Sequence, residues 1–274
     1  MQIENPQEIK LIVSDIDGTL LPYEHKVMPE EIYSLIEAVT AKGIRFMIAS
    51  GRDAGSIKEL FAPVQDKISY ISGNGAIYVE GEEVLFTQPF QQEYIRAFLD
   101  SLVGDMNLLP VIMTEKEYYI VIDGSENAIK MKREIARLKA GVPYVEVASS
   151  QDIKETICKL GVFQKRILEQ EEVQQLRDKW PKLELVCGGG QWLDVTQQGT
   201  NKGSAIAKIL DIYGLTTDNL MTFGDNENDL QMLEMAKYGY AVRTATPIAK
   251  QAAAFECESV LEVLKELLAG EKKV

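Results

Sequence analysis

Apolar residues along this chain form short, nearly continuous runs that alternate with longer segments of helical periodicity. Near the N-terminus, residues 9–13 and 44–49 are apolar runs of the kind found in strands buried on both faces. Between them, apolar side chains at 32–39 recur at helical spacing, and Gly43 offers a stop signal. The pattern predicts a strand, a helix and a second strand.

The C-terminal quarter of the chain repeats this order. A helix is predicted at 202–213, closed by Gly214, and a strand follows at 220–223. Because strands alternate with helices, we expect a parallel sheet covered on both faces, an α/β core of the doubly wound, Rossmann-like class. The other elements predicted for this core are a short helix at 56–61, a strand at 70–71, a hairpin of 77–79 and 84–86, a helix at 230–235, a strand at 240–242, and helices that Pro247 opens and Ser259 caps.

The middle of the chain has shorter, more alternating strands and more highly charged helices. We therefore expect an α+β cap domain at residues 89–188, inserted into an α/β core made of residues 1–88 and 189–274. One continuous domain is the alternative. The elements predicted for the inserted part are strands at 118–122 and 144–147 and helices at 91–103, 128–138 and 171–180.

Two connections are expected to act as hinges of the inserted part. They lie at residues 87–90 and at the glycine run 188–190. Residues 192–196, an alternating apolar run, would then return the chain to the α/β core.

The charge of the chain narrows the choice of partner. Of 274 residues, 46% are apolar, and the formal net charge is −13. This sign argues against a nucleic acid or an anionic membrane as partner. No apolar run approaches the ~20 residues of a membrane span, and the N-terminus lacks the apolar core of a signal peptide. We expect a cytoplasmic protein, a monomer or a weak homodimer, that acts on a small molecule.

Histidine and cysteine counts exclude several chemistries. His25 is the only histidine of the sequence, which excludes a multi-histidine zinc site and leaves no serine triad unless His25 is its base. Cys158, Cys187 and Cys257 are far apart and odd in number, so we expect buried small side chains rather than a disulfide framework or a thiolate metal site.

Two aspartates, Asp15 and Asp17, follow the first apolar strand. Residues two apart in an extended chain point to the same side, so both carboxylates would leave the sheet together. They would do so at the carboxyl edge, where open α/β sheets bind ligands. Because like charges this close need a cation or a retained proton, the pair suits a hard metal ion and acid/base chemistry. An ordinary Asp-Gly turn is the alternative.

A second acidic cluster follows the strand at 220–223. Asp225 and Asp229 there could simply cap and charge the next helix. Two acidic clusters at the ends of two parallel strands are more than capping requires. Brought together with Asp15 and Asp17, they would form an oxygen-rich site fit for Mg²⁺.

Two further side chains are placed where they could hold the oxygens of a phosphoryl group. Ser50 ends the second strand, and Lys202 begins the helix at 202–213. Each is weak evidence by itself, because Ser50 could belong to an ordinary loop and Lys202 could be a solvated lysine. Asn74, between two glycines, could likewise belong to a simple turn.

With these residues in place, the sequence resembles the haloacid dehalogenase-like hydrolase superfamily, and within it the Cof-type phosphatases with the larger α/β cap. Four ordered motifs carry the resemblance: DIDGTL at 15–20, ASGR at 49–52, NKG at 201–203 and GDNEND at 224–229. The stretch SGNGA at 72–76 is similar to the Asn-Gly-Ala stretch of that family. One departure is Arg243-Thr244-Ala245, where the family often has Gly-Asn-Ala.

The resemblance implies a mechanism. Asp15 would be the nucleophile that forms an aspartyl-phosphate, and Asp17 the general acid and then base. Mg²⁺ would be held by an oxygen of Asp15, the backbone carbonyl of Asp17 and the carboxylate of Asp225, with Asp229 behind these ligands or linked through water. The groups implied to bind the phosphoryl oxygens are Ser50, Gly51, Lys202 and Asn228.

This reading predicts a Mg²⁺-dependent phosphatase of small phosphorylated metabolites, sugar phosphates first among them. The inserted cap would set specificity. His25 would lie in a flap beside the site, where a solvent-exposed loop histidine is the simpler interpretation than proton transfer. The alternatives are a phosphotransferase or phosphomutase on the same core, and a non-catalytic sensor of a phosphometabolite.

Overall fold

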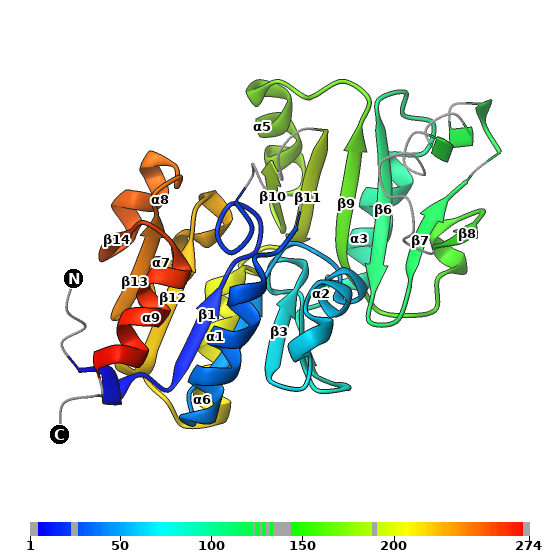
Figure 1. Cartoon of the computed structure of the whole chain (residues 1–274). Helices are drawn as coiled ribbons and strands as arrows, with labels where there is room; N and C mark the ends of the chain where they lie inside the picture. The colour runs from blue at the N-terminus through cyan, green and yellow to red at the C-terminus, as the bar shows by residue number, and fades with distance from the viewer. Residues whose placement is uncertain are drawn as a thin grey trace. The chain divides into compact units, whose positions relative to one another are not determined.

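The chain forms two compact units in the computed structural model, which describes residues 5–22, 27–122, 124–126, 128–129, 132–133, 144–187 and 191–270 (Figure 1). The core unit comprises Met1–Phe86 and Asn201–Val274, and the inserted unit comprises Thr87–Thr200. Across the described residues, no helix is long and apolar enough to cross a membrane.

The core unit is built on an eight-stranded sheet. From β14 to β3 neighbouring strands run parallel, and β4 pairs antiparallel with β3. This parallel-sheet core confirms the α/β class predicted from the apolar runs. In spatial order the strands are β14 (Phe255–Cys257), β13 (Tyr238–Val242), β12 (Leu220–Gly224), β1 (Leu11–Ser14), β2 (Arg45–Ala49), β3 (Ile68–Ser72), β4 (Ile77–Glu80) and β5 (Glu83–Thr87).

Helices cover both faces of this sheet (Figure 1). α6 (Lys202–Tyr213) and α7 (Leu230–Met235) pack on one face, where Ile206 and Met232 join the core formed by the strands. α1 (Glu30–Ala41) buries the apolar residues that predicted it and packs against α9 (Val260–Gly270). The other α-helices described in the core unit are α2 (Ala54–Leu60) and α8 (Pro247–Ala252).

The order of the strands decides where the charged side chains meet. β1 lies between β12 and β2, and all three run in the same direction. Their carboxyl ends therefore share one edge of the sheet, and Asp15, Ser50 and Asp225 each follow one of these ends directly.

The inserted unit is a six-stranded sheet with helices on one face. Its strand pairs are antiparallel except β7 with β8. α3 (Gln92–Ser101) and α5 (Gln170–Lys179) contribute Phe98 and Val173 to the same apolar cluster as Leu160 and Leu193 from the strands. In spatial order the strands are β10 (Leu183–Cys187), β11 (Trp192–Gln197), β9 (Ile157–Gln164), β6 (Leu108–Thr114), β7 (Tyr118–Val121) and β8 (Val145–Val147).

One expected boundary differs from the structure. Residues 192–196 were expected to return the chain to the core, but β11 pairs antiparallel with β9 and β10 of the inserted unit. The second boundary therefore falls between Thr200 and Asn201, twelve residues later than the sequence placed it. An alternating apolar run indicates a strand without naming its partner. The glycine run at 188–190 and most of the helix expected at 128–138 lie outside the described residues.

Candidate active site

Asp15 is fixed at the carboxyl end of β1. Its backbone N–H donates to the carbonyl oxygen of Phe223 on β12 at 3.0 Å, which continues the parallel pairing one residue past the strand. The residue is only 5% exposed, and one carboxylate oxygen accepts a hydrogen bond from Lys202 Nζ at 2.6 Å. A carboxylate so enclosed has lost most of its hydration and depends on the charges around it.

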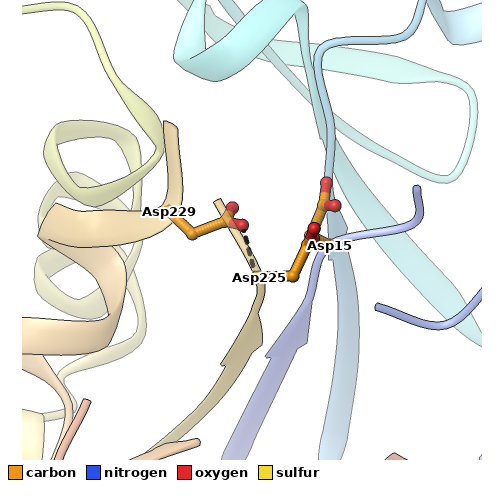
Figure 2. Close-up of side chains that lie close together, drawn as sticks. All are labelled: Asp15, Asp225 and Asp229. Atoms are coloured by element: carbon orange, nitrogen blue, oxygen red, sulfur yellow. Dashed lines mark hydrogen bonds between the residues drawn. The ribbon is translucent and has the colours of Figure 1, made fainter. Parts of the chain in front are cut away.

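Three carboxylates gather at this edge of the sheet (Figure 2). Asp15, Asp225 and Asp229 are all buried, and each offers an oxygen within 4.8 Å of the others. Asp229 is held in place by the backbone N–H groups of Asp225 and Asn226, which donate to its Oδ2 at 2.9 and 3.1 Å. The arrangement brings together the strand-end carboxylates that the sequence singled out, apart from that of Asp17.

Gly224 makes the close approach of Asp229 possible. A Cβ atom built at this glycine would lie 2.5 Å from the Asp229 Cβ. Any side chain at position 224 would therefore push Asp229 away from the two backbone N–H groups that hold it. On the other side of the cluster, Thr19 donates to Asp225 Oδ1 at 2.8 Å.

Lys202 lies at the centre of the charged cluster and is fully buried. Its ammonium group donates to Asp15 and to Asp229, both at 2.6 Å. The start of α6 sets its position, because the Asn201 side chain caps the helix by accepting from the Ser204 N–H at 2.8 Å. The alternative of an ordinary solvated lysine is thereby removed.

The cluster has more negative than positive charge. Burial raises the pKa of Asp15 to about 8, and Asp229 and Asp225 add to the increase while Lys202 opposes it. Burial by itself would lower the pKa of Lys202, but Asp15 and Asp229 outweigh it, so the pKa is raised and the ammonium stays charged. Three carboxylates face one ammonium here, so a further positive charge would relieve the repulsion among them.

The donor set fits a hard divalent cation. Carboxylate and carbonyl oxygens are the ligands that Mg²⁺ takes in proteins, and the carboxylates of this cluster, beside the protonated nitrogen of Lys202, are oxygen donors of this kind. A divalent cation among these oxygens would neutralise the excess charge and lower the pKa of Asp15. Asp15, Asp225 and Asp229 are the side chains that could hold it.

Asp17 does not point into the cluster. β1 ends at Ser14, and Asp17 lies in the turn that follows, so the alternation expected of an extended chain does not reach it. Its side chain is 44% exposed and accepts two hydrogen bonds from Arg52, at 2.8 Å from Nε and 2.6 Å from Nη2. This contact raises the pKa of Arg52 further above its ordinary value. Arg52 was not among the residues predicted for the site, although it stands in the ASGR motif.

Four residues form a second group next to the cluster. Ser50 is buried, its Oγ accepts from the Arg52 N–H at 3.2 Å, and its carbonyl accepts from the Asn74 N–H at 2.9 Å. Asn228 Nδ2 donates to Asn74 Oδ1 at 3.2 Å, and a Cβ built at Gly51 would lie 3.1 Å from that same oxygen. Asn74 thus links Ser50 and Gly51 to Asn228.

Asn74, which could have belonged to a simple turn, lies among the candidate site residues. Among the described residues it is the non-glycine residue with a positive φ, +57°, a conformation that asparagine tolerates better than most side chains. Gly75 follows with φ +108°, where a Cβ would lie 2.3 Å from the Asn201 carbonyl oxygen. This close approach joins the Asn74 turn to the start of α6. In the sequence, the glycines on either side of Asn74 were the feature that could have indicated this unusual backbone conformation.

The loop that departs from the family pattern, together with the residue after it, donates hydrogen bonds to backbone carbonyl groups of the candidate site. The Thr246 N–H donates to the Asp225 carbonyl at 2.8 Å, and Thr244 Oγ1 donates to the Gly18 carbonyl at 3.3 Å. These bonds connect the segment after β13 to both aspartate loops. Nothing in the sequence pattern indicated them. His25 lies outside the described residues.

Comparison with known proteins identifies the family. The model of the haloacid dehalogenase-like hydrolase family matches residues 12–264, so the chain belongs to that family. YkrA of Bacillus subtilis is 29% identical over 258 residues, which cover 92% of this chain and 93% of YkrA. YwtE of the same organism, a 5-amino-6-(5-phospho-D-ribitylamino)uracil phosphatase, is 26% identical over 292 residues, covering 96% of this chain and 99% of YwtE.

Among solved structures, the HAD subclass IIB sugar phosphatase BT4131 is similar over nearly the whole chain. It has a TM-score of 0.78 and 26% sequence identity, and the match covers 93% of this chain and 98% of BT4131. The resemblance to the Cof-type subfamily inferred from the four motifs is thereby confirmed. The family and the phosphatases among these relatives also bear out the prediction of a hydrolase of the phosphatase class.

Proposed function

We propose that this hydrolase is a Mg²⁺-dependent phosphatase that releases phosphate from small phosphorylated metabolites, sugar phosphates first among them. The observation that carries the proposal is the buried Lys202 between Asp15 and Asp229. This arrangement holds the Asp15 carboxylate enclosed at the edge of the sheet, where the lysine and a bound divalent cation together would keep it charged, as a nucleophile requires. YwtE and BT4131, which act on a ribityl phosphate and on sugar phosphates by their names, support the substrate class.

In this proposal the chemistry proceeds in two displacements. A carboxylate oxygen of Asp15 attacks the phosphorus, a bond forms between them, and the bond from phosphorus to the leaving oxygen breaks. Asp17, once one hydrogen bond from Arg52 has opened and the free oxygen has taken up a proton from solvent, gives that proton to the leaving oxygen. Asp17 then takes a proton from water, which attacks the phosphorus of the aspartyl-phosphate and frees Asp15 and inorganic phosphate.

The remaining site residues hold charge and orientation. Lys202 would stabilise Asp15 and the negative charge of the phosphoryl group, and Ser50, Gly51 and Asn228 would bind the phosphoryl oxygens. Mg²⁺, held by Asp15, Asp225 and the Asp17 backbone carbonyl with Asp229 next to them, would offset repulsion between the anionic nucleophile and the anionic substrate.

Arg52 would be a positioning residue for Asp17. Its two hydrogen bonds fix the plane of the Asp17 carboxyl group, which an unpaired half-exposed side chain would not keep. One of the two must open before Asp17 can hold the proton that it transfers, because both carboxylate oxygens accept from Arg52 in this structure. The inserted unit as the specificity domain, the monomeric or weakly dimeric state and the cytoplasmic location stay predictions.

The proposal is tested by phosphate release. Purified protein should hydrolyse p-nitrophenyl phosphate and hexose 6-phosphates with Mg²⁺ and lose this activity in EDTA. Asp15→Asn should reduce the rate to background, because an amide is not a nucleophile for phosphorus. The control is Asp66→Asn, whose side chain is 68% exposed and remote in sequence from the motifs.

Three outcomes would contradict the proposal. Full activity of Asp15→Asn would show that Asp15 is not the nucleophile, and full activity in EDTA would show that the reaction needs no metal ion. Transfer of labelled phosphate to a sugar in place of water would indicate the phosphotransferase alternative. Ligand-induced stabilisation without turnover across a metabolite panel would indicate the sensor.

A further inference from the structure

The turn after β3 has an unusual backbone. Gly73, Asn74 and Gly75 have φ angles of +64°, +57° and +108°, a sign that glycine adopts freely and other residues adopt at a cost. Asn74 alone among these three residues has a side chain, and it is only 8% exposed. The turn therefore holds one buried amide at a position where glycine would suit the backbone better.

Backbone contacts fix this turn in the core unit. The N–H of Asn74 donates to the Ser50 carbonyl at 2.9 Å, and the N–H of Gly73 donates to the Arg52 carbonyl at 3.1 Å. A Cβ built at Gly75 would lie 2.3 Å from a backbone carbonyl oxygen at the start of α6. Since these contacts involve only the backbone, they do not explain why the middle residue is an asparagine.

The Asn74 side chain makes a different set of contacts. Its Oδ1 accepts from Asn228 Nδ2 at 3.2 Å. A Cβ built at Gly51 would lie 3.1 Å from the same Oδ1 and 3.2 Å from Nδ2, so the amide fills the space that a side chain at position 51 would take. The amide thus reaches from the loop after β2 to the loop after β12, and both loops supply groups to the candidate phosphoryl site.

The hydrogen bond from Asn228 to Asn74 has a direct consequence for the orientation of Asn228. A side-chain amide is planar and has two N–H donors on one side and a carbonyl acceptor on the other. When one N–H donates to Asn74, the direction of the second N–H is set, and this is the group that Asn228 can offer to a phosphoryl oxygen. A rotated amide would instead present its carbonyl oxygen, which an anionic phosphoryl group repels.

We propose that Asn74 is a positioning residue of the phosphoryl site, whose side chain holds the Asn228 amide with an N–H directed at the bound phosphoryl group. This proposal rests on the phosphatase function proposed above. Asn74 acts through Asn228 and does not itself bind the phosphoryl oxygens. The contact accounts for an asparagine at a backbone position that favours glycine.

The test removes the Asn74 amide and keeps the backbone of the turn. In Asn74→Gly, KM for p-nitrophenyl phosphate and the competitive inhibition constant of inorganic phosphate should both rise about tenfold, because one hydrogen bond to an anionic group is weakened. kcat should change by less than about threefold, because substrate and transition state share the oxygens that Asn228 binds.

Asn74→Ala separates the side chain from the backbone. It removes the same amide but keeps a Cβ at a positive φ, so it should unfold more easily than Asn74→Gly while raising both constants by the same factor. If the constants rise only in the alanine variant, the strain of the turn is the cause and the inference is wrong. Should the alanine variant not fold, Asn74→Gly carries the test.

A double-mutant cycle tests whether Asn74 acts through Asn228. Asn228→Ala should raise both constants at least as much as Asn74→Gly does, and adding Asn74→Gly to it should change them by less than about twofold. Losses that add in full would show that Asn74 binds the phosphoryl group by itself. Unchanged constants in Asn228→Ala would show that the amide it positions does not contact phosphate. Either result would overturn the inference.

The matched control is another hydrogen-bonded asparagine of the core unit. Asn219 precedes β12, at the end of the strand opposite Asp225; its Nδ2 donates to the Glu8 carbonyl and its Oδ1 accepts from the Thr216 N–H, both at 3.0 Å. Asn219→Gly should leave both constants within about twofold, whatever it does to the unfolding midpoint.

The outcomes distinguish this inference from the proposed function. If the unaltered protein releases no phosphate, the proposed function itself fails. If the unaltered protein is active and Asn74→Gly has unaltered constants, only the role of Asn74 is refuted.

Discussion

Two buried lysines, one in each unit, show how the same residue type is used in different ways. Lys202 is fully buried at the edge of the core sheet, between Asp15 and Asp229 and next to a third carboxylate, Asp225. Lys159 lies on the face of the inserted sheet and pairs with Asp194. The first cluster has an excess of negative charge, and the two charges of the second cancel.

The difference in charge balance between the two clusters indicates whether each one needs a counter-charge. An unbalanced buried cluster needs a counter-charge, which a divalent cation supplies together with a site for an anionic group. An ion pair of one ammonium and one carboxylate has no such need for a counter-charge.

The largest effect is expected from Lys202→Met. Loss of the ammonium leaves Asp15 and Asp229 facing each other in a buried site, so stability should fall by about 3–5 kcal/mol, the usual result of removing one partner of a buried pair. Urea unfolding measures this loss, and added Mg²⁺ should return part of it. Phosphate release should drop to background.

The matched control for this prediction is Lys208→Met on the same helix. Its ammonium lies 5.4 Å from the Phe86 ring centroid and belongs to an exposed residue, so the unfolding midpoint should change little. An unaltered midpoint and unaltered activity in Lys202→Met would refute the central place given to this lysine.

A smaller effect is expected from glycine substitutions that test the packing around the two sites. In Gly224→Ala the new Cβ meets Asp229 Cβ at 2.5 Å, so the aspartate must move; we expect a loss of about 1–3 kcal/mol from overpacking and reduced activity. In Gly161→Ala the nearest atom is Trp192 Cε3 at 3.4 Å, an ordinary contact. Gly224→Ala should therefore lower the thermal unfolding midpoint and the rate of phosphate release clearly more than Gly161→Ala does. Equal effects of the two substitutions would argue against a rigid catalytic cluster.

Features that depend on residues near one another along the chain could be predicted from the sequence, and features that depend on distant residues could not. Asp15 and Asp225 were found because each follows an apolar strand directly, and parallel strands bring their ends to one edge. β11 was assigned to the wrong unit because its apolar alternation is the same whichever sheet it joins. Such pairing is decided by contacts distant in sequence, which a single-sequence pattern does not contain.

The same limit explains which side chains of the site were missed. Arg52 reaches Asp17 across thirty-five positions, and Thr246 reaches the Asp225 carbonyl across twenty-one. Lys159 stood out in no motif, because one charge within an apolar strand does not show which face it occupies. Lys202 was found only because it begins a capped helix within a motif.

Arg52→Lys tests the half-exposed ion pair and should have a modest effect. A lysine keeps the charge but cannot donate two parallel hydrogen bonds to Asp17, so its carboxyl group loses its fixed plane. Because this pair is partly exposed, we expect less than about 1 kcal/mol of lost stability after allowing for solvent screening. We expect about a tenfold lower kcat with little change in KM, measured with p-nitrophenyl phosphate. A rise in KM alone would instead make Arg52 a substrate-binding residue.

The smallest change in stability is expected where both members of the balanced pair are replaced. Lys159→Met alone leaves the Asp194 carboxylate largely buried without its ammonium, whereas Lys159→Met combined with Asp194→Leu removes both charges together. The double variant should be within about 1 kcal/mol of the unaltered protein, and more stable than the single variant, since apolar replacement of a whole buried pair is often neutral. A double variant that unfolds more easily than the single one would show that the pair stabilises the sheet.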